Sequence, residues 1–338
     1  MATIKDVAKR VGVTPTTVSR VLNNRGYISD KTKKAVYQAM EELNYQPNEI
    51  ARSLTKKDTS CIGIVLPSIR HPFFCSVLSS LEYYAAKRGY KIMVCNSQED
   101  QEKEKEYLEM LDSNRVSGII FCSRSGSIEG NLAMSRPVIA FERELSEEVP
   151  AVLCDNYQGG VMATKRLIEG GCRHLIALGG TREVHLPADT RCEAFLKTCQ
   201  ACGAEGQVFY GSEEQFNHQE YEEWIERILR EHEEVDGVFA TSDVIGAQVI
   251  RVCRRLGRQV PGDVQIVGFD DTQIAELTCP ALTSVHQPID QMCDYAVDAI
   301  VRKMRGEMIP TKIVLPVTLV ERESVKAVSL GEQEMRGR

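Results

Sequence analysis

Short apolar runs alternate with amphipathic stretches along most of the chain after residue 60, and this alternation limits the possible folds more than any other feature. The strand-like runs cover residues 61–66, 91–95, 118–122, 138–141, 174–178, 238–240 and 264–269, and helical periodicity occurs, for example, over 104–111 and 157–168. Such alternation predicts parallel βαβ sheets with helices on both faces, which bind ligands beyond the carboxyl ends of their strands. The length after residue 60 suits two lobes of this kind.

The first sixty residues show a different pattern, in which short helices surround a tight turn. Apolar residues at positions 4, 7, 8 and 11 have helical spacing, with Thr3 as the N-cap and Gly12 at the end. Thr14 then caps a second helix with Pro15 at its first position. Two helices across a three-residue turn predict a helix-turn-helix unit, and a third helix follows from residue 29 or 30.

The second helix has one apolar and one polar face. At about 100° per residue, apolar positions 18, 21 and 22 lie together, while Thr16, Arg20 and Asn23 lie roughly opposite. An arginine can bond both acceptors of a guanine edge in the major groove, and Thr or Asn can reach base edges or phosphates. The alternative is the exposed polar face of a small three-helix domain. Lysines at positions 31, 33 and 34 oppose the dipole of the third helix, which favours a role in binding phosphate.

Residues 47–60 have the pattern of a short helix followed by a polar linker. Asn48, after Pro47, can cap one or two helical turns over residues 49–54. Such a helix is much shorter than the roughly 12 to 15 residues needed for independent stability. We therefore expect it to form only when another element packs against it.

The segments IKDVAKRVGVTPTTVSRVLN (4–23), NYQPN (44–48) and ARSL (51–54) resemble the DNA-binding headpiece of the lactose/galactose-repressor (LacI/GalR) family. The resemblance implies a sequence-specific transcriptional regulator, most simply a repressor. The residues that would hold phosphates are Thr3, Thr14, Ser19, Asn23, Ser29, Thr32 and Asn48. Pro15, Thr16 and Arg20 would meet bases, and Leu54 would be a wedge in the minor groove. Pro15 replaces the polar residue common at its position, so we expect only a methylene contact there.

The same resemblance extends to about residue 330 and implies a bilobed core like that of periplasmic binding proteins. The expected fold class is α/β, with an all-α headpiece at 1–46, a hinge helix and linker at 47–60, and the core at 61–330. We expect an N-lobe of about 61–157 and 289–319, and a C-lobe of about 158–286 and 320–330. The polar tail, 331–338, lacks the leucine heptads of a tetramerising segment.

Candidate effector-binding residues lie near the ends of the predicted strands. Phe73 and Phe74 follow the first strand and could stack on a sugar ring, although core packing is as good an explanation because phenylalanine is usually buried. Arg191 matches a family arginine that binds ligand hydroxyl or carboxylate groups, with a surface ion pair as the alternative. Asp270 matches a family aspartate that accepts hydrogen bonds from the ligand, with a turn or helix cap as the alternative.

Further polar residues at strand ends have two explanations each. Ser242, Asp155 and Asn156 could contact a ligand or cap helices. Gln287 lies where the chain should cross between lobes, so it could contact the ligand or hold the hinge backbone. The turn at 179–181 lacks the phosphate-binding pattern of nucleotide-binding loops, and no catalytic motif is recognisable.

The candidate side chains suit a sugar or sugar phosphate better than a purine. Residues 96–98 and 104–111 are most similar to sucrose-operon repressors within the family. A purine effector, or a phosphorylated protein partner as in catabolite control, remains an alternative inside the family. Outside it, a solute-binding protein of a transport system would share the core but have no use for residues 1–60, and an enzyme acting on sugars is a weaker alternative.

The expected mechanism couples the lobes to DNA through a homodimer. One recognition helix and one hinge helix cannot cover a two-fold site, so we expect two copies on a pseudo-palindromic double-stranded operator. Effector binding would move the lobes and change the separation of the two hinge segments. The sequence predicts no cofactor, no metal site, no catalytic residue and no enzymatic activity.

The charges are divided unevenly along the chain. Residues 1–60 hold 11 basic and 6 acidic residues, a net charge of +5, whereas the remainder holds 30 and 42, a net charge of −12. The overall −7 therefore hides a basic segment suited to phosphate. Twelve cysteines, mostly single within apolar stretches, indicate a reducing compartment, and the pair at 199 and 202 lacks a second pair at zinc spacing. With no long apolar run and no secretory start, we expect a cytoplasmic protein without a membrane partner.

Overall fold

The computed structural model describes residues 2–22, 26–45, 59–123, 136–180 and 186–327. The chain divides into two compact units, Met1–Thr59 and Ser60–Arg338, which we call the headpiece and the core. The expected hinge helix at 49–54, most of the linker and the polar tail lie outside the described residues.

The headpiece has three described helices, α1 (Ile4–Val11), α2 (Pro15–Leu22) and α3 (Asp30–Glu42). Their ends match the sequence signals: the Thr3 amide donates to Asp6 Oδ2 at 2.8 Å, and the Thr17 amide donates to Thr14 Oγ1 at 3.2 Å. Gly12 ends α1 at a φ of 75°, a conformation that costs glycine little. The apolar faces meet in a small core made of Val7, Ala8, Val18, Val21, Val36 and Ala39. The predicted helix-turn-helix arrangement is therefore present.

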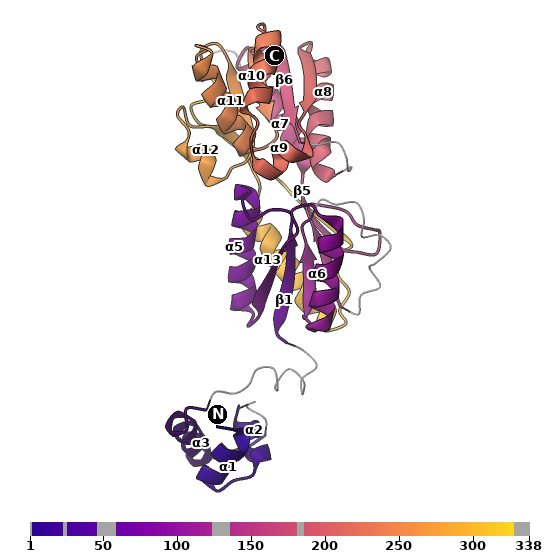
Figure 1. The fold of residues 1–338 in the computed structure, drawn as a ribbon. Helices are drawn as coiled ribbons and strands as arrows, with labels where there is room; N and C mark the ends of the chain where they lie inside the picture. The colour runs from indigo at the N-terminus through magenta and orange to yellow at the C-terminus, as the bar shows by residue number, and fades with distance from the viewer. Residues whose placement is uncertain (1, 23–25, 46–58, 124–135, 181–185, 328–338) are drawn as a thin grey trace. The chain divides into compact units, whose positions relative to one another are not determined.

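The core consists of two lobes (Figure 1). The first lobe contains β1 (Cys61–Leu66), α5 (Pro72–Lys87), β2 (Lys91–Asn96), α6 (Gln101–Ser113), β3 (Gly118–Phe121), β4 (Val138–Phe141), β5 (Ala151–Cys154), α13 (Ile289–Met304) and β11 (Lys312–Leu315). The second lobe contains α7 (Asn156–Glu169), β6 (His174–Gly179), the 3₁₀ turn η1 (Pro187–Asp189), α8 (Thr190–Cys202), β7 (Glu205–Tyr210), α9 (Glu213–His218), α10 (Glu222–Glu231), β8 (Gly237–Ala240), α11 (Asp243–Arg255), β9 (Gln265–Asp270), α12 (Gln273–Leu277), β10 (Thr283–His286) and β12 (Thr318–Val320). The chain crosses between them after β5, β10 and β11.

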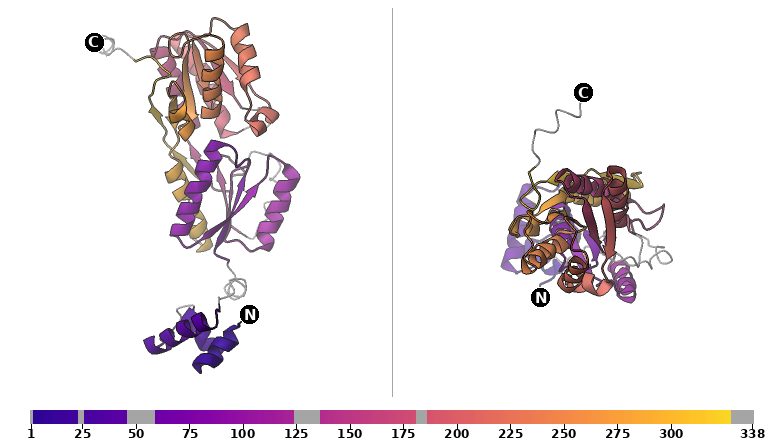
Figure 2. Two further views of the ribbon diagram at one scale, coloured as in Figure 1. Left: turned by 60° about the vertical axis from the view of Figure 1, so that its left-hand side comes forward. Right: turned by 90° about the horizontal axis from the view of Figure 1, so that it is seen from above.

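The sheet of the first lobe has the strand order β11-β5-β4-β3-β1-β2, and all of its neighbouring strands are parallel. In its register, Ile62 of β1 lies opposite Ile92 of β2 and Gly118 of β3. Ile64 packs in the cluster that includes α5 and α13, whereas the next residue, Val65, packs in the cluster that includes α6. Helices thus cover both faces, as the left view of Figure 2 shows for α5 and α6.

The sheet of the second lobe has the order β12-β10-β9-β8-β6-β7. Ala177 of β6 packs in the cluster that includes α7 and α8, and Ile176 and Leu178 pack in the cluster with α10 and α11. Burial on both faces explains why these strands are continuous apolar runs in the sequence. The predicted α/β fold class is confirmed, with one departure: β12 pairs antiparallel with β10.

Five strands, β5, β7, β10, β11 and β12, were not among the predicted apolar runs. Three of them lie at sheet edges, where one side of the strand is unpaired. The edge strand β7, for example, exposes its first three residues, Glu205, Gly206 and Gln207. Edge strands of this kind carry charged and small residues, so an apolar run does not mark them.

Candidate functional site

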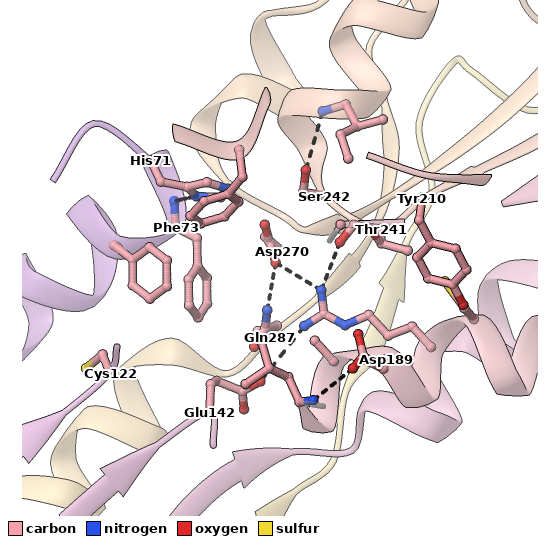
Figure 3. Close-up of a pocket in the computed structure, with 18 of the residues that line it drawn as sticks. His71, Phe73, Cys122, Glu142, Asp189, Tyr210, Thr241, Ser242, Asp270 and Gln287 are labelled. Atoms are coloured by element: carbon pink, nitrogen blue, oxygen red, sulfur yellow. Dashed lines mark hydrogen bonds and ion pairs between the residues drawn. The ribbon is translucent and has the colours of Figure 1, made fainter. Parts of the chain in front are cut away.

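One cavity of about 120 Å³ lies between the lobes of the core, at the carboxyl ends of strands from both sheets. Its lining includes all six residues that the sequence analysis proposed for the effector, namely Phe73, Phe74, Arg191, Ser242, Asp270 and Gln287. Figure 3 shows several of them, with Asp270 and Gln287 directed toward each other. The cavity is where a two-lobed α/β core is expected to bind a ligand.

Arg191 is the central charged group of the cavity. It stands at the start of α8 and is only 7% exposed, so the alternative of a surface ion pair is wrong. Its Nε donates to Asn156 Oδ1 at 2.7 Å, and its Nη1 donates to the Thr241 carbonyl at 2.8 Å. The guanidinium carbon lies 3.5 Å from the centroid of the Phe269 ring. These contacts fix the planar group before any ligand contact is made.

Two carboxylates lie on either side of this guanidinium. Glu142 Oε2 is 3.9 Å from Arg191 Nη2, and Asp270 Oδ1 is 3.8 Å from Arg191 Nη1. Glu142 comes from the first lobe, directly after β4, whereas Asp270 ends β9 of the second lobe. Arg191 therefore connects the two lobes electrostatically, with an acidic group from each.

Asp270 is buried and Glu142 is partly buried, and the loss of solvent raises the pKa of both carboxyl groups. Burial raises the pKa of Glu142, while Arg191 and the hydrogen bonds from Cys154 and Asn156 oppose the rise. Burial also raises the pKa of Asp270 well above its ordinary value, against the attraction of Arg191. The effect of burial thus exceeds the effect of Arg191, and both carboxyl groups hold their protons more tightly than carboxyl groups in water do.

The backbone at the two acidic residues adopts uncommon conformations. Glu142 has a φ of 53°, and Asp270 has a φ of 108°. Positive φ is rare for residues other than glycine, and such conformations persist only where the surrounding structure enforces them. The hydrogen bond from Gln287 Nε2 to Asp270 Oδ1, at 2.7 Å, contributes to that enforcement.

Two glycines of α7 allow the close packing that places Arg191. A Cβ on Gly160 would lie 2.4 Å from the Arg191 carbonyl oxygen, and one on Gly159 would lie 2.5 Å from the Phe269 ring. Both distances are far shorter than van der Waals contact, so any side chain here would push α8 or Phe269 away. The pair thus sets the position of the arginine and of the ring beneath it.

Phe73 and Phe74 begin α5 and are 5% and 6% exposed. Their ring centroids are 5.1 Å apart at an interplanar angle of 74°, an edge-to-face arrangement. They belong to the apolar core and also line the cavity, so core packing is confirmed, and stacking on a sugar ring stays a prediction.

The remaining residues at strand ends cap helices, line the cavity or contact the residues that line it. Ser242 does both, because its Oγ accepts from the Ile245 amide at 3.4 Å while the residue lines the cavity. Asp155 caps α7 through the Gln158 amide, whereas Asn156 bridges Glu142 and Arg191. Sequence reasoning missed Glu142, although it follows a predicted strand just as Asp270 does. It also missed two cavity-lining residues, His71 and Phe216, for which no sequence signal was evident.

The headpiece presents its candidate DNA-contacting residues at the surface. Thr3, Thr14, Pro15, Thr16, Arg20 and Ser29 are exposed, and Ser19 and Thr32 are half-buried. Several of the hydroxyls already serve as helix caps, since Ser29 Oγ accepts from the Thr32 amide at 3.3 Å. Asn23, Asn48 and Leu54 lie outside the described residues.

Within the described part of the chain, no group of His, Cys, Asp and Glu side chains is arranged to hold a metal ion. The twelve cysteines are present as free thiols. Among the same residues, none of the helices has the length and apolar character needed to span a bilayer.

A helix-turn-helix headpiece attached to a two-lobed core, whose cavity combines apolar walls with a few charged side chains, defines a class of protein, the ligand-responsive DNA-binding regulator. Residues 3–48 match the model of the lacI family of bacterial regulatory proteins, and residues 164–325 match that of a periplasmic binding protein-like domain. The chain is 37% identical over 326 residues to the sucrose operon repressor of Streptococcus mutans serotype c, covering 96% of this chain and 100% of that protein. It is 35% identical over 327 residues to the ribose operon repressor of Halalkalibacterium halodurans, covering 96% and 98%. The chain therefore belongs to the lacI family of bacterial regulatory proteins.

Solved structures show the same architecture. A complex of the transcriptional regulator CelR with cellobiose is 30% identical to this chain, with a TM-score of 0.72 and coverage of 96% of this chain and 100% of that chain. A lac repressor dimer bound to operator, 24% identical, has a TM-score of 0.85 with coverage of 96% and 99%, which shows the likeness of the fold. The predicted family and the predicted role as a DNA-binding regulator are confirmed.

Proposed function

We propose that the protein is a repressor of carbohydrate-utilisation genes whose operator affinity is controlled by a sugar bound in the cavity around Arg191. The observation that carries this proposal is the meeting of Phe73, Phe74, Arg191 and Asp270 in one cavity at the ends of both sheets. The proposal assigns no catalytic step to these residues and requires no cofactor.

The chemistry of the cavity supports a polyhydroxy ligand. Asp270 and Glu142 offer carboxylate acceptors, and Arg191 is a fixed donor, so hydroxyl groups can be bonded on several sides. The oxygen Gln287 Oε1 is buried and makes no hydrogen bond among the described residues, so a ligand hydroxyl would satisfy it. The aromatic rings provide the apolar wall against which a sugar ring packs. The named relatives that act on sucrose and ribose operons, and the cellobiose-bound regulator, agree with this choice.

The charge balance favours a neutral sugar over a sugar phosphate. Around the guanidinium of Arg191 the described lining places two carboxyl groups, Glu142 and Asp270, and each offsets its positive charge when ionised, although the pKa of both is raised. A phosphate entering this space would approach two acidic groups and a single, already engaged arginine. Binding a dianion there would cost more than binding an uncharged polyol.

For the headpiece we propose the contacts that the family resemblance implies. Thr16 and Arg20 would meet bases, with Pro15 giving a methylene contact, while Thr3, Thr14, Ser19, Asn23, Ser29, Thr32 and Asn48 would hold phosphates. Leu54 would be the minor-groove wedge; if Leu54→Ala leaves the bending of operator DNA unchanged, that role is wrong. The exposed positions of Thr16 and Arg20 on α2 support the assignment to bases.

The proposed mechanism divides the chain by role. Residues 1–46 read a pseudo-palindromic operator as a homodimer in the cytoplasm, residues 47–60 form the hinge, and residues 61–330 sense the effector and pair the two copies. A sugar that binds one arrangement of the lobes better than another shifts the hinge equilibrium. Such coupling is typically about 1 to 3 kcal/mol, or about 5- to 150-fold in operator affinity.

The test is a thermal-shift screen of the full chain against free sugars, sugar phosphates and purines, followed by calorimetric titration of each hit. A ligand that binds only the folded state raises the melting temperature by mass action. We expect free sugars to raise the melting temperature, and we expect Asp270→Asn to weaken their binding by about 10- to 100-fold. The control Glu233→Gln changes an exposed carboxylate outside the cavity lining and should leave binding unchanged. Stabilisation by purines alone would instead favour a purine-responsive regulator, and stabilisation by sugar phosphates alone would overturn the charge argument.

A further inference from the structure

His71 occupies an unusual position at the start of α5. Helix N-caps are usually Ser, Thr, Asp or Asn, whose oxygens accept a backbone hydrogen bond. Here the His71 Nδ1 atom takes that role and accepts from the Phe73 amide at 3.3 Å. The imidazole is only 6% exposed and lines the cavity (Figure 3). The cap hydrogen bond thus fixes the His71 ring, which belongs to the first lobe, at the wall of the cavity.

One aromatic partner of the His71 ring comes from the second lobe. The His71 ring is stacked on Phe216 of α9, with ring centroids 5.7 Å apart and an interplanar angle of 26°. Phe216 is 7% exposed and also lines the cavity. On its own side, His71 is held edge-on by Phe74 at 5.6 Å and 69°. The two lobes are therefore joined by an aromatic contact that belongs to none of the three chain crossings.

We propose that the His71–Phe216 stack is a latch that holds the two lobes together over the cavity, with His71 as its positioning residue. Any movement that separates α5 from α9 must break the stack, so its strength adds to the contacts of Glu142 with Arg191 and Asn156 in limiting how often the cavity opens. Stacked aromatic pairs are worth enough to change such an equilibrium by about 2- to 13-fold. A role of the latch in the entry and release of an effector rests on the proposed function. The latch itself does not depend on any ligand.

Four buried cysteines allow opening to be measured without a ligand. Cys122 and Cys192 line the cavity and are 3% and 2% exposed. Cys95 and Cys253 are equally buried but pack in apolar clusters outside the cavity, one in each lobe. Burial raises the pKa of the Cys122 thiol, so it should react only when opening admits water. The first pair therefore reports opening of the cleft, and the second pair reports loosening of the lobes.

The experiment measures alkylation of each cysteine by N-ethylmaleimide in the full chain, resolved by mass spectrometry. His71→Asn keeps a good N-cap but removes the ring, and Phe216→Leu removes the ring from the other side. Each should speed labelling of Cys122 and Cys192 by about 2- to 13-fold, and the double variant should be no faster than the faster single variant. His71→Phe keeps a ring but loses the cap acceptor, and it should label at nearly the rate of the unchanged protein.

Three outcomes would overturn the latch. The first is unchanged labelling of Cys122 and Cys192 in both single variants. The second is equal acceleration of Cys95 and Cys253, which would show that the substitutions loosen the lobes themselves. The third is fast labelling in His71→Phe, which would assign the effect to the lost cap and not to the stack. Binding of a sugar is not needed for any of them, so failure of the latch and failure of the proposed effector are distinguishable.

Discussion

The candidate DNA-contacting surface of the headpiece and the cavity of the core differ in burial and in how far apart their residues lie in the sequence. On α2, Thr16 and Arg20 are exposed, and their surroundings come from one local stretch of chain. In the core, Arg191 and Asp270 are buried, and their partners come from distant parts of the sequence. The partners that we propose for Thr16 and Arg20 are groups of the DNA, whereas Arg191 and Asp270 are already hydrogen-bonded in the free protein.

This difference determines how each site should respond to change. Exposed charges are screened by salt, and their loss removes only the contacts they make with the partner. A buried charge removed from a hydrogen-bonded cluster leaves its partners unsatisfied, so the folded state itself is weakened. Variants in the headpiece should therefore alter DNA binding alone, and variants in the cavity should alter stability and effector binding together.

Deleting residues 1–60 should produce the largest effect, a complete loss of operator binding with sugar binding retained. The core forms a compact unit with its own apolar clusters, so it should fold without the headpiece. Electrophoretic mobility shift and calorimetry on residues 61–338 measure the two activities. Operator binding by this truncated chain would contradict the assignment and would favour another role for the basic segment.

Arg191→Ala should have the next largest effect. It removes the donors to Asn156 and to the Thr241 carbonyl and leaves Glu142 and Asp270 without their cation. We expect sugar binding to be lost and the free energy of unfolding to fall by about 3 kcal/mol or more. Chemical denaturation measures the second quantity. Arg254→Ala, on the exposed face of α11, is the matched control, and an equal effect there would contradict the role of burial.

Arg20→Ala should lower discrimination between operator and non-operator DNA by about 1 to 3 kcal/mol without changing the melting temperature. Lys34→Ala, an exposed residue of α3, is the comparison, since loss of a phosphate contact weakens binding to all sequences and reduces the salt dependence. Fluorescence anisotropy at several salt concentrations separates the two. Uniform weakening by Arg20→Ala would show that it contacts phosphate and not a base.

Glu142→Gln should have the smallest effect of these variants. It should change how the stability of the protein varies with pH. Burial raises the folded-state pKa of Glu142 above its ordinary value of 4.5, so the folded chain keeps this proton where the unfolded chain has lost it. Its contribution to stability is greatest below pH 4.5 and is lost as the pH rises through the raised pKa. The variant cannot titrate, so its melting temperature relative to the unchanged protein should rise as the pH is increased from 4.5 through the raised pKa of Glu142. A constant difference across this range would mean that Glu142 titrates normally.

Much of the fold could be predicted from the sequence because its signals are local. Thr3, Gly12 and Thr14 mark helix ends through their own backbone preferences, and strands buried on both faces appear as apolar runs. The edge strand β7 could not be predicted in this way, since its exposed residues carry no such run. Two interior strands of only four residues each, β5 and β10, were missed as well, so short length can hide a strand as an edge position does.

The candidate site was predictable where polar residues follow buried strands. Asp270 was found by this rule, and Glu142 could have been found by it as well. The partnership between His71 and Phe216 could not, because it depends on how two lobes pack across a cavity. Whether Phe73 packs in the core or lines the cavity was likewise undecidable from periodicity, and in the structure it does both.

We propose above all that a sugar in the Arg191 cavity controls the affinity of the headpiece for DNA. The most direct test is anisotropy titration of an operator, selected from random duplex DNA, with and without the sugar identified by thermal shift. We expect the sugar to change operator affinity by about 5- to 150-fold. In Asp270→Asn the same change should need about 10- to 100-fold more sugar, while the sugar-free operator affinity stays unchanged. A sugar that binds in calorimetry but leaves operator affinity the same would contradict this proposal.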